Sequence, residues 1–242
     1  MKIFSFIKKL FSLVIMIILI NAPPVQAQSE SGFGININAG IRAGITLPAL
    51  TIDYQPYTNL LVAPVAGGYF QVKFLPWMAV SIDVLYTQYG GNQIDPLWIY
   101  APQSPALIDL QSSQLVIHSV EFPLAVKIGL PNWTESVSPF FSIGGSMAIF
   151  TQARIYNQYL DDSFSIQPIR SQSTELVSSA INSYDYALLP GMGVDFNTES
   201  FSFTLELFYR LGLSAVNSYK NLYSTDFGAS AFGVKIGIGM NL

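Results

Sequence analysis

Apolar residues alternate with polar or small residues along most of the chain, beginning at Ile35. The first alternating run spans 35–45. One parity holds Ile35, Ile37, Ala39, Ile41, Ala43 and Ile45, and the other holds Asn36, Asn38, Gly40, Arg42 and Gly44. A period of two is typical of a β-strand whose two faces meet different surroundings. The pattern therefore predicts an all-β protein.

The same alternation predicts seven more strands, and the connections between them differ in length. The predicted strands are 65–74, 79–90, 114–128, 138–150, 184–196, 201–213 and 227–242. Long connections at 47–64, 91–113, 151–183 and 214–226 alternate with short ones at 75–78, 129–137 and 197–200. Outer-membrane barrels have short periplasmic turns and long extracellular loops. We therefore expect an eight-stranded antiparallel up-and-down transmembrane β-barrel in a bacterial outer membrane, with both termini in the periplasm.

The composition favours a membrane barrel over other β-folds. Charged residues make up 11% of the chain, whereas soluble domains carry about 25%. No apolar run long enough for a membrane helix follows residue 27. A barrel meets both limits because its strands cross the bilayer with alternating apolar residues.

The first 27 residues have the features of a cleavable signal peptide. Three lysines (Lys2, Lys8 and Lys9) precede an apolar stretch at 10–20, and a small-residue site ends at Ala27. The barrel domain is then predicted at 28–242. Removal of the lysines leaves 11 − 3 = 8 bases against 15 acids, so nucleic-acid binding is not expected. The chain has no cysteine, which excludes disulfides and thiolate metal sites.

Charged residues within the predicted strands all fall on the parity opposite to the apolar one. They are Arg42, Lys73, Asp83, Glu121, Lys127, Asp185, Asp195, Glu206, Arg210 and Lys235. This set of five acids and five bases is predicted to point into the lumen, because a charge facing lipid near the midplane would cost about 2–4 kcal/mol. The lumen of an eight-stranded barrel is just wide enough for side chains to fill it. A structural salt-bridge network is therefore expected, and a proton or ion site on the acids is the alternative.

Two other features carry weaker expectations. Pro123 and Pro190 lie inside predicted strands, where proline implies a bulge or a missing ladder bond. His118 is the only histidine and falls on the lipid-facing parity. It is interpreted as an interfacial polar residue, because nothing beside it supplies a Ser-His-Asp order for nucleophilic catalysis. No catalytic, cofactor-binding or metal-ligating residue is predicted, and the chain is not expected to be an enzyme.

Four segments resemble the PorT-like outer-membrane β-barrel family. They are IDVLYTQYGG (82–91), VEFPLAVKIG (120–129), SPFFSIGGSMA (138–148) and LELFYRLGL (205–213), in the family's order. Asp83, Phe140 and Leu242 depart from the residues common there, which are Glu, Tyr and Phe. The resemblance implies an eight-stranded outer-membrane barrel, and the family's namesake is associated with protein secretion.

The expected function is that of a structural or interaction protein, a subunit of an envelope assembly. The alternative is a component of protein secretion or transport across the outer membrane. Expected partners are outer-membrane lipid, the barrel insertion machinery during assembly, and an envelope protein bound through the loops at 91–113 and 151–183. Aromatic residues are frequent in these loops; they favour either a binding surface or a packed cap over the barrel mouth.

Overall fold

A computed structural model describes residues 36–53, 55–92, 110–130, 136–161, 169–176, 181–217 and 226–242. The predicted signal peptide at 1–27 lies outside these residues. The described part forms ten strands: β1 (Asn36–Ile52), β2 (Gln55–Pro56), β3 (Ala63–Leu75), β4 (Met78–Asn92), β5 (Leu110–Gly129), β6 (Val137–Asp161), β7 (Ile169–Leu176), β8 (Tyr184–Asn197), β9 (Phe201–Gly212) and β10 (Gly228–Asn241). None of the described ranges contains a helix that is long and apolar enough to cross a membrane.

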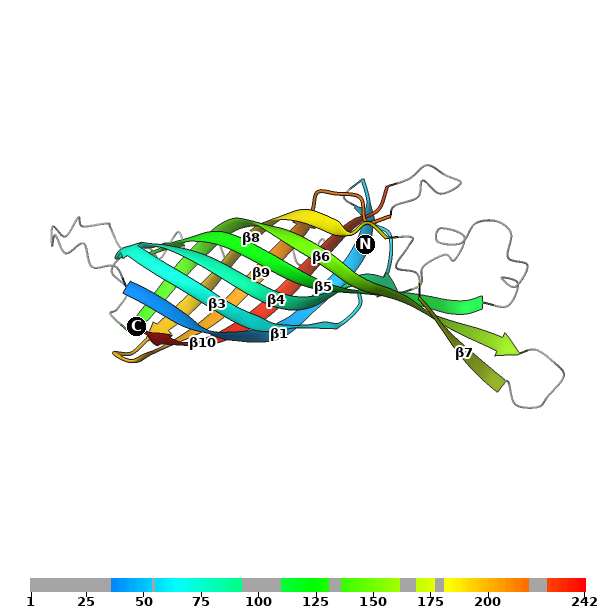
Figure 1. The fold of residues 1–242 in the computed structure, drawn as a ribbon, viewed down its shortest axis with the longest axis horizontal. Coiled ribbons are helices and arrows are strands. Elements are labelled where there is room, and N and C mark those ends of the chain that lie inside the picture. The colour runs from blue at the N-terminus through cyan, green and yellow to red at the C-terminus, as the bar shows by residue number, and fades with distance from the viewer. Residues whose placement is uncertain are drawn as a thin grey trace.

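Eight of the described strands form a closed antiparallel barrel (Figure 1). The order around the wall is β1-β3-β4-β5-β6-β8-β9-β10, and β10 pairs with β1 to close it. The closing ladder runs from Asn38 opposite Asn241 to Thr51 opposite Gly228. The predicted eight-stranded up-and-down barrel is therefore confirmed.

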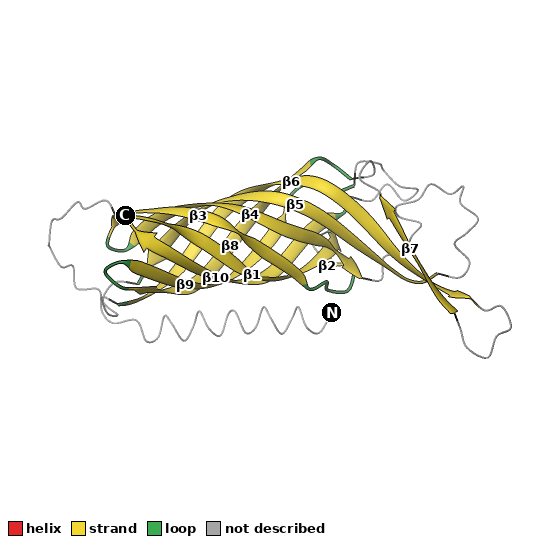
Figure 2. Cartoon of the chain, turned by 60° about the horizontal axis from the view of Figure 1, so that its bottom comes forward, coloured by secondary structure: helices red, strands yellow, loops and turns green. Residues whose placement is uncertain are grey.

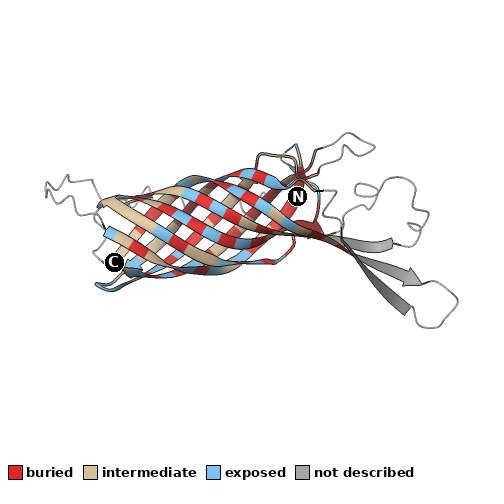
Figure 3. Ribbon diagram, viewed as in Figure 1, coloured by how far each residue is buried: buried red, intermediate tan, exposed pale blue. Residues whose placement is uncertain are grey.

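Burial alternates along each wall strand, and Figure 3 shows this as a checkerboard of buried and exposed positions. On β1, Ile41 is 70% exposed whereas the adjacent Arg42 is 4% exposed. The apolar parity thus faces outward and the charged parity faces inward. This arrangement is the reverse of a soluble barrel and suits a lipid surrounding.

Inward-facing glycines allow the wall to bend tightly around so narrow a lumen. A Cβ atom on Gly40 would lie 2.1 Å from the carbonyl oxygen of Ile238, and one on Gly44 would lie 1.9 Å from that of Val234. Both carbonyls belong to β10, the partner strand across the closure. Any side chain at these two positions would push the closing strands apart.

The two strand prolines interrupt the ladder on one side only. Pro123 of β5 pairs with Ser146 of β6, but the β4–β5 register passes from Ile82↔Leu124 to Leu85↔Glu121 with no bridge between. Pro190 of β8 likewise pairs with β6, while its side toward β9 lacks a bridge. The register is unchanged across each gap, so the proline removes a ladder bond without a bulge.

Three predicted long connections are wrong in part, because strands continue into them. β1 runs on to Ile52 and pairs with β2, and β5 already begins at Leu110. β6 runs through Asp161 and pairs with β7 in a ribbon that projects beyond the barrel rim (Figure 2). Much of the predicted loop 151–183 is therefore a β-hairpin.

A β-bulge explains why alternation predicted the end of β6 too early. Consecutive β5 residues His118 and Ser119 pair with Gln152 and Phe150, so Thr151 is the extra residue. The inward parity changes there from even, as at Ala148, to odd, as at Ala153. A bulge shifts every later side chain to the opposite parity. The alternation therefore stops at the bulge, although the strand continues beyond it.

Candidate functional site

Four charged side chains form a closed ring in the lumen. Arg42 of β1 pairs with Asp83 of β4, and Lys235 of β10 lies 3.3 Å from Glu206 of β9. Cross-contacts of 3.8 Å join Arg42 to Glu206 and Lys235 to Asp83. The two bases and two acids balance, so the ring carries no net charge.

Hydroxyl groups and aromatic rings complete the surroundings of this charge ring. Ser81 donates to Asp83 at 2.8 Å, and Ser142 donates to Glu206 at 3.0 Å. The guanidinium of Arg42 lies 4.2 Å from the centre of the Tyr69 ring, and the ammonium of Lys235 lies 4.6 Å from that of Phe208. Cation–π contacts of this kind are strongest where water is excluded.

A second cluster is centred on Arg210 of β9, which has no exposed surface. Its guanidinium lies 3.0 Å from Glu121 and 2.7 Å from Asp185, and it also donates to the carbonyl of Ala229 at 2.7 Å. The Tyr89 hydroxyl donates to Glu121 at 2.5 Å. One base faces two acids here, so both described ion pairs of the cluster depend on Arg210.

The remaining predicted lumen charges lie toward the barrel end with the short turns. Lys127 of β5 lies 3.4 Å from Asp195 of β8, which also accepts from Thr204 at 2.6 Å. Lys73 of β3 is half-buried, and no carboxylate of the described residues lies within 4 Å of it. The structure thus brings nine of the ten predicted residues into ion pairs and leaves Lys73 apart.

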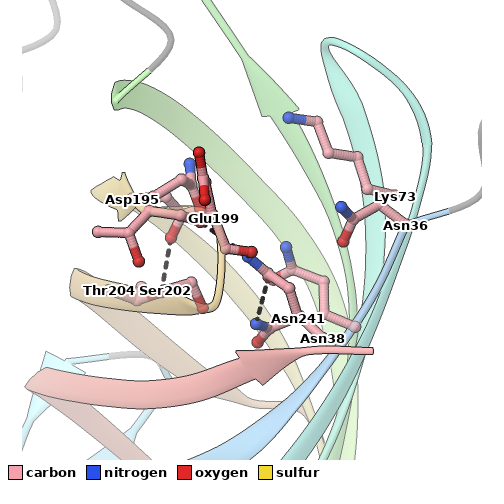
Figure 4. Close-up of a pocket in the computed structure, with 11 residues that line it drawn as sticks. Asn36, Asn38, Lys73, Asp195, Glu199, Ser202, Thr204 and Asn241 are labelled. Atoms are coloured by element: carbon pink, nitrogen blue, oxygen red, sulfur yellow. Dashed lines mark hydrogen bonds between the residues drawn. The ribbon is translucent and has the colours of Figure 1, made fainter.

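Lys73 lines a polar cavity of about 260 Å³ that lies at this end, beside the C-terminus (Figure 4). Amides, hydroxyls and a few charges line it: Asn36, Asn38, Gln71, Lys73, Asp195, Asn197, Thr198, Glu199, Ser202, Thr204 and Asn241. Asn38 donates to Asn241 at 3.0 Å and so joins the first strand to the last. Asp195, which lines the cavity, also pairs with Lys127.

The opposite end of the lumen is apolar. A buried cluster there comprises Leu50, Tyr89, Leu115, Ile117, Ala148, Ala153, Ile155, Val216, Phe227, Ala229 and Ala231. β9 shows the sequence of levels along the axis, since Thr204 lines the cavity, Glu206 lies in the ring and Arg210 lies in the second cluster. We refer to the apolar cluster as the apolar plug.

The apolar plug was not predicted from the sequence, although a signal for it exists. Leu115, Val116 and Ile117 form an apolar run on both parities of β5, which marks a strand segment with no polar side. Leu115 and Ile117 lie on the inward parity, so this run indicates that the inward face also meets apolar atoms.

His118 lies on the outer wall, as its parity predicts, and contacts no catalytic partner among the described residues. Its Nδ1 atom lies 2.6 Å from the hydroxyl of Tyr86, which also accepts from Gln88 at 2.7 Å. In the described ranges, no three His, Asp or Glu side chains gather closely enough to hold a metal ion. Nine of the ten lumen charges form ion pairs with one another, so the chemistry that the lumen shows is charge pairing.

A comparison with protein families gives a direct match. The family model described as outer membrane protein beta-barrel domain covers residues 26–218. The chain belongs to this family of outer-membrane β-barrels. The bacterial outer membrane is accordingly the location of this barrel.

Several solved outer-membrane barrels are distantly similar in structure. Ail of Yersinia pestis, solved with the heparin analogue sucrose octasulfate, is 13% identical with a TM-score of 0.38 and coverage of 85% of this chain and 99% of that chain. OprG of Pseudomonas aeruginosa is 12% identical with a TM-score of 0.44 and coverage of 86% and 95%. Neisserial surface protein A is 11% identical with a TM-score of 0.43 and coverage of 86% and 98%. Comparison with curated proteins gives no match.

Proposed function

We propose that this outer-membrane barrel is a non-enzymatic structural or interaction protein of the cell envelope. The observation that carries the proposal is the filled lumen. Ion pairs occupy its middle and the apolar plug occupies one end. A passage for solutes would have to displace both, so the function is assigned to surfaces outside the lumen.

The ribbon of β6 and β7 is the surface best suited to a protein partner. Eight residue pairs, from Arg154↔Leu176 to Asp161↔Ile169, join its two strands. Among the described strands β7 pairs only with β6, so its second edge presents backbone donors and acceptors. An extended segment of a partner can add to such an edge through main-chain hydrogen bonds.

Orientation is part of the proposal: both termini in the periplasm, and the ribbon outside the cell. The short turns lie at the barrel end that holds the C-terminus, and in outer-membrane barrels the short turns are periplasmic. An epitope tag inserted after Asp162 should be labelled on intact cells. Labelling that requires permeabilised cells would reverse the orientation.

Purification in mild detergent tests the interaction role. The register of the ribbon strands shows which residues to delete together in a variant that lacks the ribbon. Removing 110–113, 157–161 and 169–173 together deletes matched partners, because Asn157 pairs with both Ser113 and Ser173, and Asp161 pairs with Ile169. The shortened barrel should fold and keep its heat resistance but lose a partner that co-purifies with the parent. A parent that purifies alone after cross-linking on cells contradicts the proposal.

The second candidate is transport or secretion, and the cavity of about 260 Å³ is the observation that favours it. A polar space at one mouth could admit a small hydrophilic ligand. Planar-bilayer recording on the folded protein separates the two candidates. Silence is expected for the interaction protein, whereas steady ion-selective steps would establish transport.

A further inference from the structure

One sector of the outer wall carries polar groups where the rest carries apolar ones. Tyr86 and Gln88 of β4, His118 of β5, and Gln152 and Arg154 of β6 all lie on the outward parity. Gln88, His118 and Gln152 form one row across three strands, since His118 pairs with both of the others. We call these five residues the outer-wall donor cluster.

The donor cluster lies at the border of the apolar belt. The next outward row toward the short turns contains Tyr86 of the cluster together with Val120 and Ile149, and Val120 pairs with both of the others. Ile149 is 42% exposed, as suits a residue facing acyl chains. On the other side Arg154 pairs with Val116, one step nearer the ribbon. The cluster therefore lies at the level where acyl chains give way to headgroups.

The hydrogen bonds of the cluster leave one proton donor without a described acceptor. Gln88 donates to the Tyr86 oxygen at 2.7 Å, and the Tyr86 oxygen lies 2.6 Å from His118 Nδ1. If the tyrosine donates to Nδ1, the neutral imidazole carries its proton on Nε2. If Nδ1 donates instead, the tyrosine proton is unused. In either tautomer one donor remains for a group outside the wall.

Arg154 adds a positive charge to the cluster. It is the one charged residue on the outward parity of the wall strands whose side chains are described. No carboxylate of that part of the chain lies within 4 Å of it. Gln152 accepts from its Nε at 3.2 Å and its Nη2 at 3.0 Å when the amide is oriented to satisfy both groups. The other nitrogen, Nη1, is not used by that contact.

We propose that the outer-wall donor cluster binds the phosphate of a phosphorylated glycolipid in the outer leaflet. A guanidinium with neighbouring N–H or O–H donors suits a phosphate, which accepts several charge-assisted hydrogen bonds. The cluster offers donors and no carboxylate, so a neutral or cationic headgroup would gain little from it. The cluster lies at the headgroup level on the side of the membrane that faces outward in the proposed orientation. The phosphate is therefore assigned to an outer-leaflet lipid, and the inference rests on that proposed orientation.

The test measures lipid retention by the folded full-length protein. The protein is reconstituted in phosphatidylcholine vesicles containing bisphosphorylated lipid A, extracted gently, and analysed by native mass spectrometry. Arg154→Gln should weaken retention about tenfold or more, as expected when a hydrogen bond to a charged group is lost. Lys73→Gln is the matched control, because it removes the same charge at the other end of the barrel and should change nothing.

Three outcomes would overturn the inference. They are equal retention by the parent and Arg154→Gln, equal retention of dephosphorylated lipid A, and equal displacement by phosphatidylglycerol. Heat-dependent gel mobility verifies that each variant is folded, and Arg154→Lys, which keeps the charge, should retain part of the binding. Partner co-purification and bilayer conductance are measured separately. A lost lipid site therefore leaves the proposed function standing, and a failed proposed function leaves the lipid site standing.

Discussion

The two ends of the lumen are filled by different kinds of side chain. At the end of the short turns, amides and hydroxyls such as Asn38 and Ser202 surround a cavity of about 260 Å³. At the other end Leu115, Ile117 and Phe227 pack into a core. The charged clusters lie between them. One barrel thus combines a polar mouth with a core like that of a soluble protein, and substitutions inside the lumen should cost more than substitutions at the mouth.

The largest effect is expected for Arg210→Met, deep in the lumen. Loss of the guanidinium leaves Glu121 and Asp185 buried without a counter-charge, and removing one partner of a buried pair costs about 3–5 kcal/mol. Urea unfolding in detergent, followed by circular dichroism, should show this loss. Lys73→Met removes a base that has no described ion pair and should cost much less. Equal losses for the two variants would refute a depth dependence.

A somewhat smaller effect is expected for Ile117→Ala in the apolar plug. Ile117 has no exposed surface, so truncation leaves a cavity and should lower the free energy of unfolding by about 2–4 kcal/mol. Leu124→Ala on the same strand is the control, because Leu124 is 54% exposed on the outer face. Acyl chains can fill the space that it leaves. A control as costly as Ile117→Ala would mean that the plug is not a packed core.

Glu206→Gln in the charge ring should have an intermediate effect. The amide keeps the shape and can keep the contact with Ser142, which lies 3.0 Å away. It loses the charge that faces Lys235, and a hydrogen bond to a charged group is worth about 1.5–3 kcal/mol. Heat-dependent gel mobility should show a lower transition temperature. A variant as heat-resistant as the parent would show that the ring does not act as a closed network.

The smallest effect is expected for Glu199→Gln at the mouth of the cavity. Glu199 is exposed on the turn between β8 and β9, and substitutions on such surfaces stay within about 0.5 kcal/mol. The same urea titration measures it. A loss comparable with that of Glu206→Gln would show that the mouth is as tightly coupled as the ring.

Alternation predicted the strands and their inward charges because a strand places successive side chains on opposite faces. Arg42, Glu206 and Lys235 were assigned to the lumen on this ground alone, and all three are buried there. The ladder then determines which strands bring them together, since Lys235 is directly opposite Glu206. The eight-stranded closure follows from counting strands, because β10 must pair with β1.

Alternation could not predict features that change the parity of a strand or that pack another segment over it. The bulge at Thr151 exchanges the two faces of β6. Beyond it, the apolar residues no longer follow the parity by which the strand was predicted. The extension of β1 beyond Thr46 loses alternation for another reason. Pro48, Ala49 and Leu50 are all buried, and the following segment returns onto them through the contact of Leu50 with Thr58. A pattern of one sequence segment cannot show what packs over it.

The charge ring has a consequence for the order of assembly. Its members come from β1, β4, β9 and β10, so two lie on one side of the closing seam and two on the other. The C-terminal strand is synthesised and exported last. Until it meets β1, Lys235 and Glu206 cannot reach Arg42 and Asp83, and an unclosed sheet exposes half a ring at each margin. Each half keeps its own acid–base pair, Arg42 with Asp83 and Lys235 with Glu206, but loses the cross-contacts and the closed wall around them. Charges exposed at a margin are costly in hydrocarbon, so the ring favours a closed barrel over a partly inserted sheet.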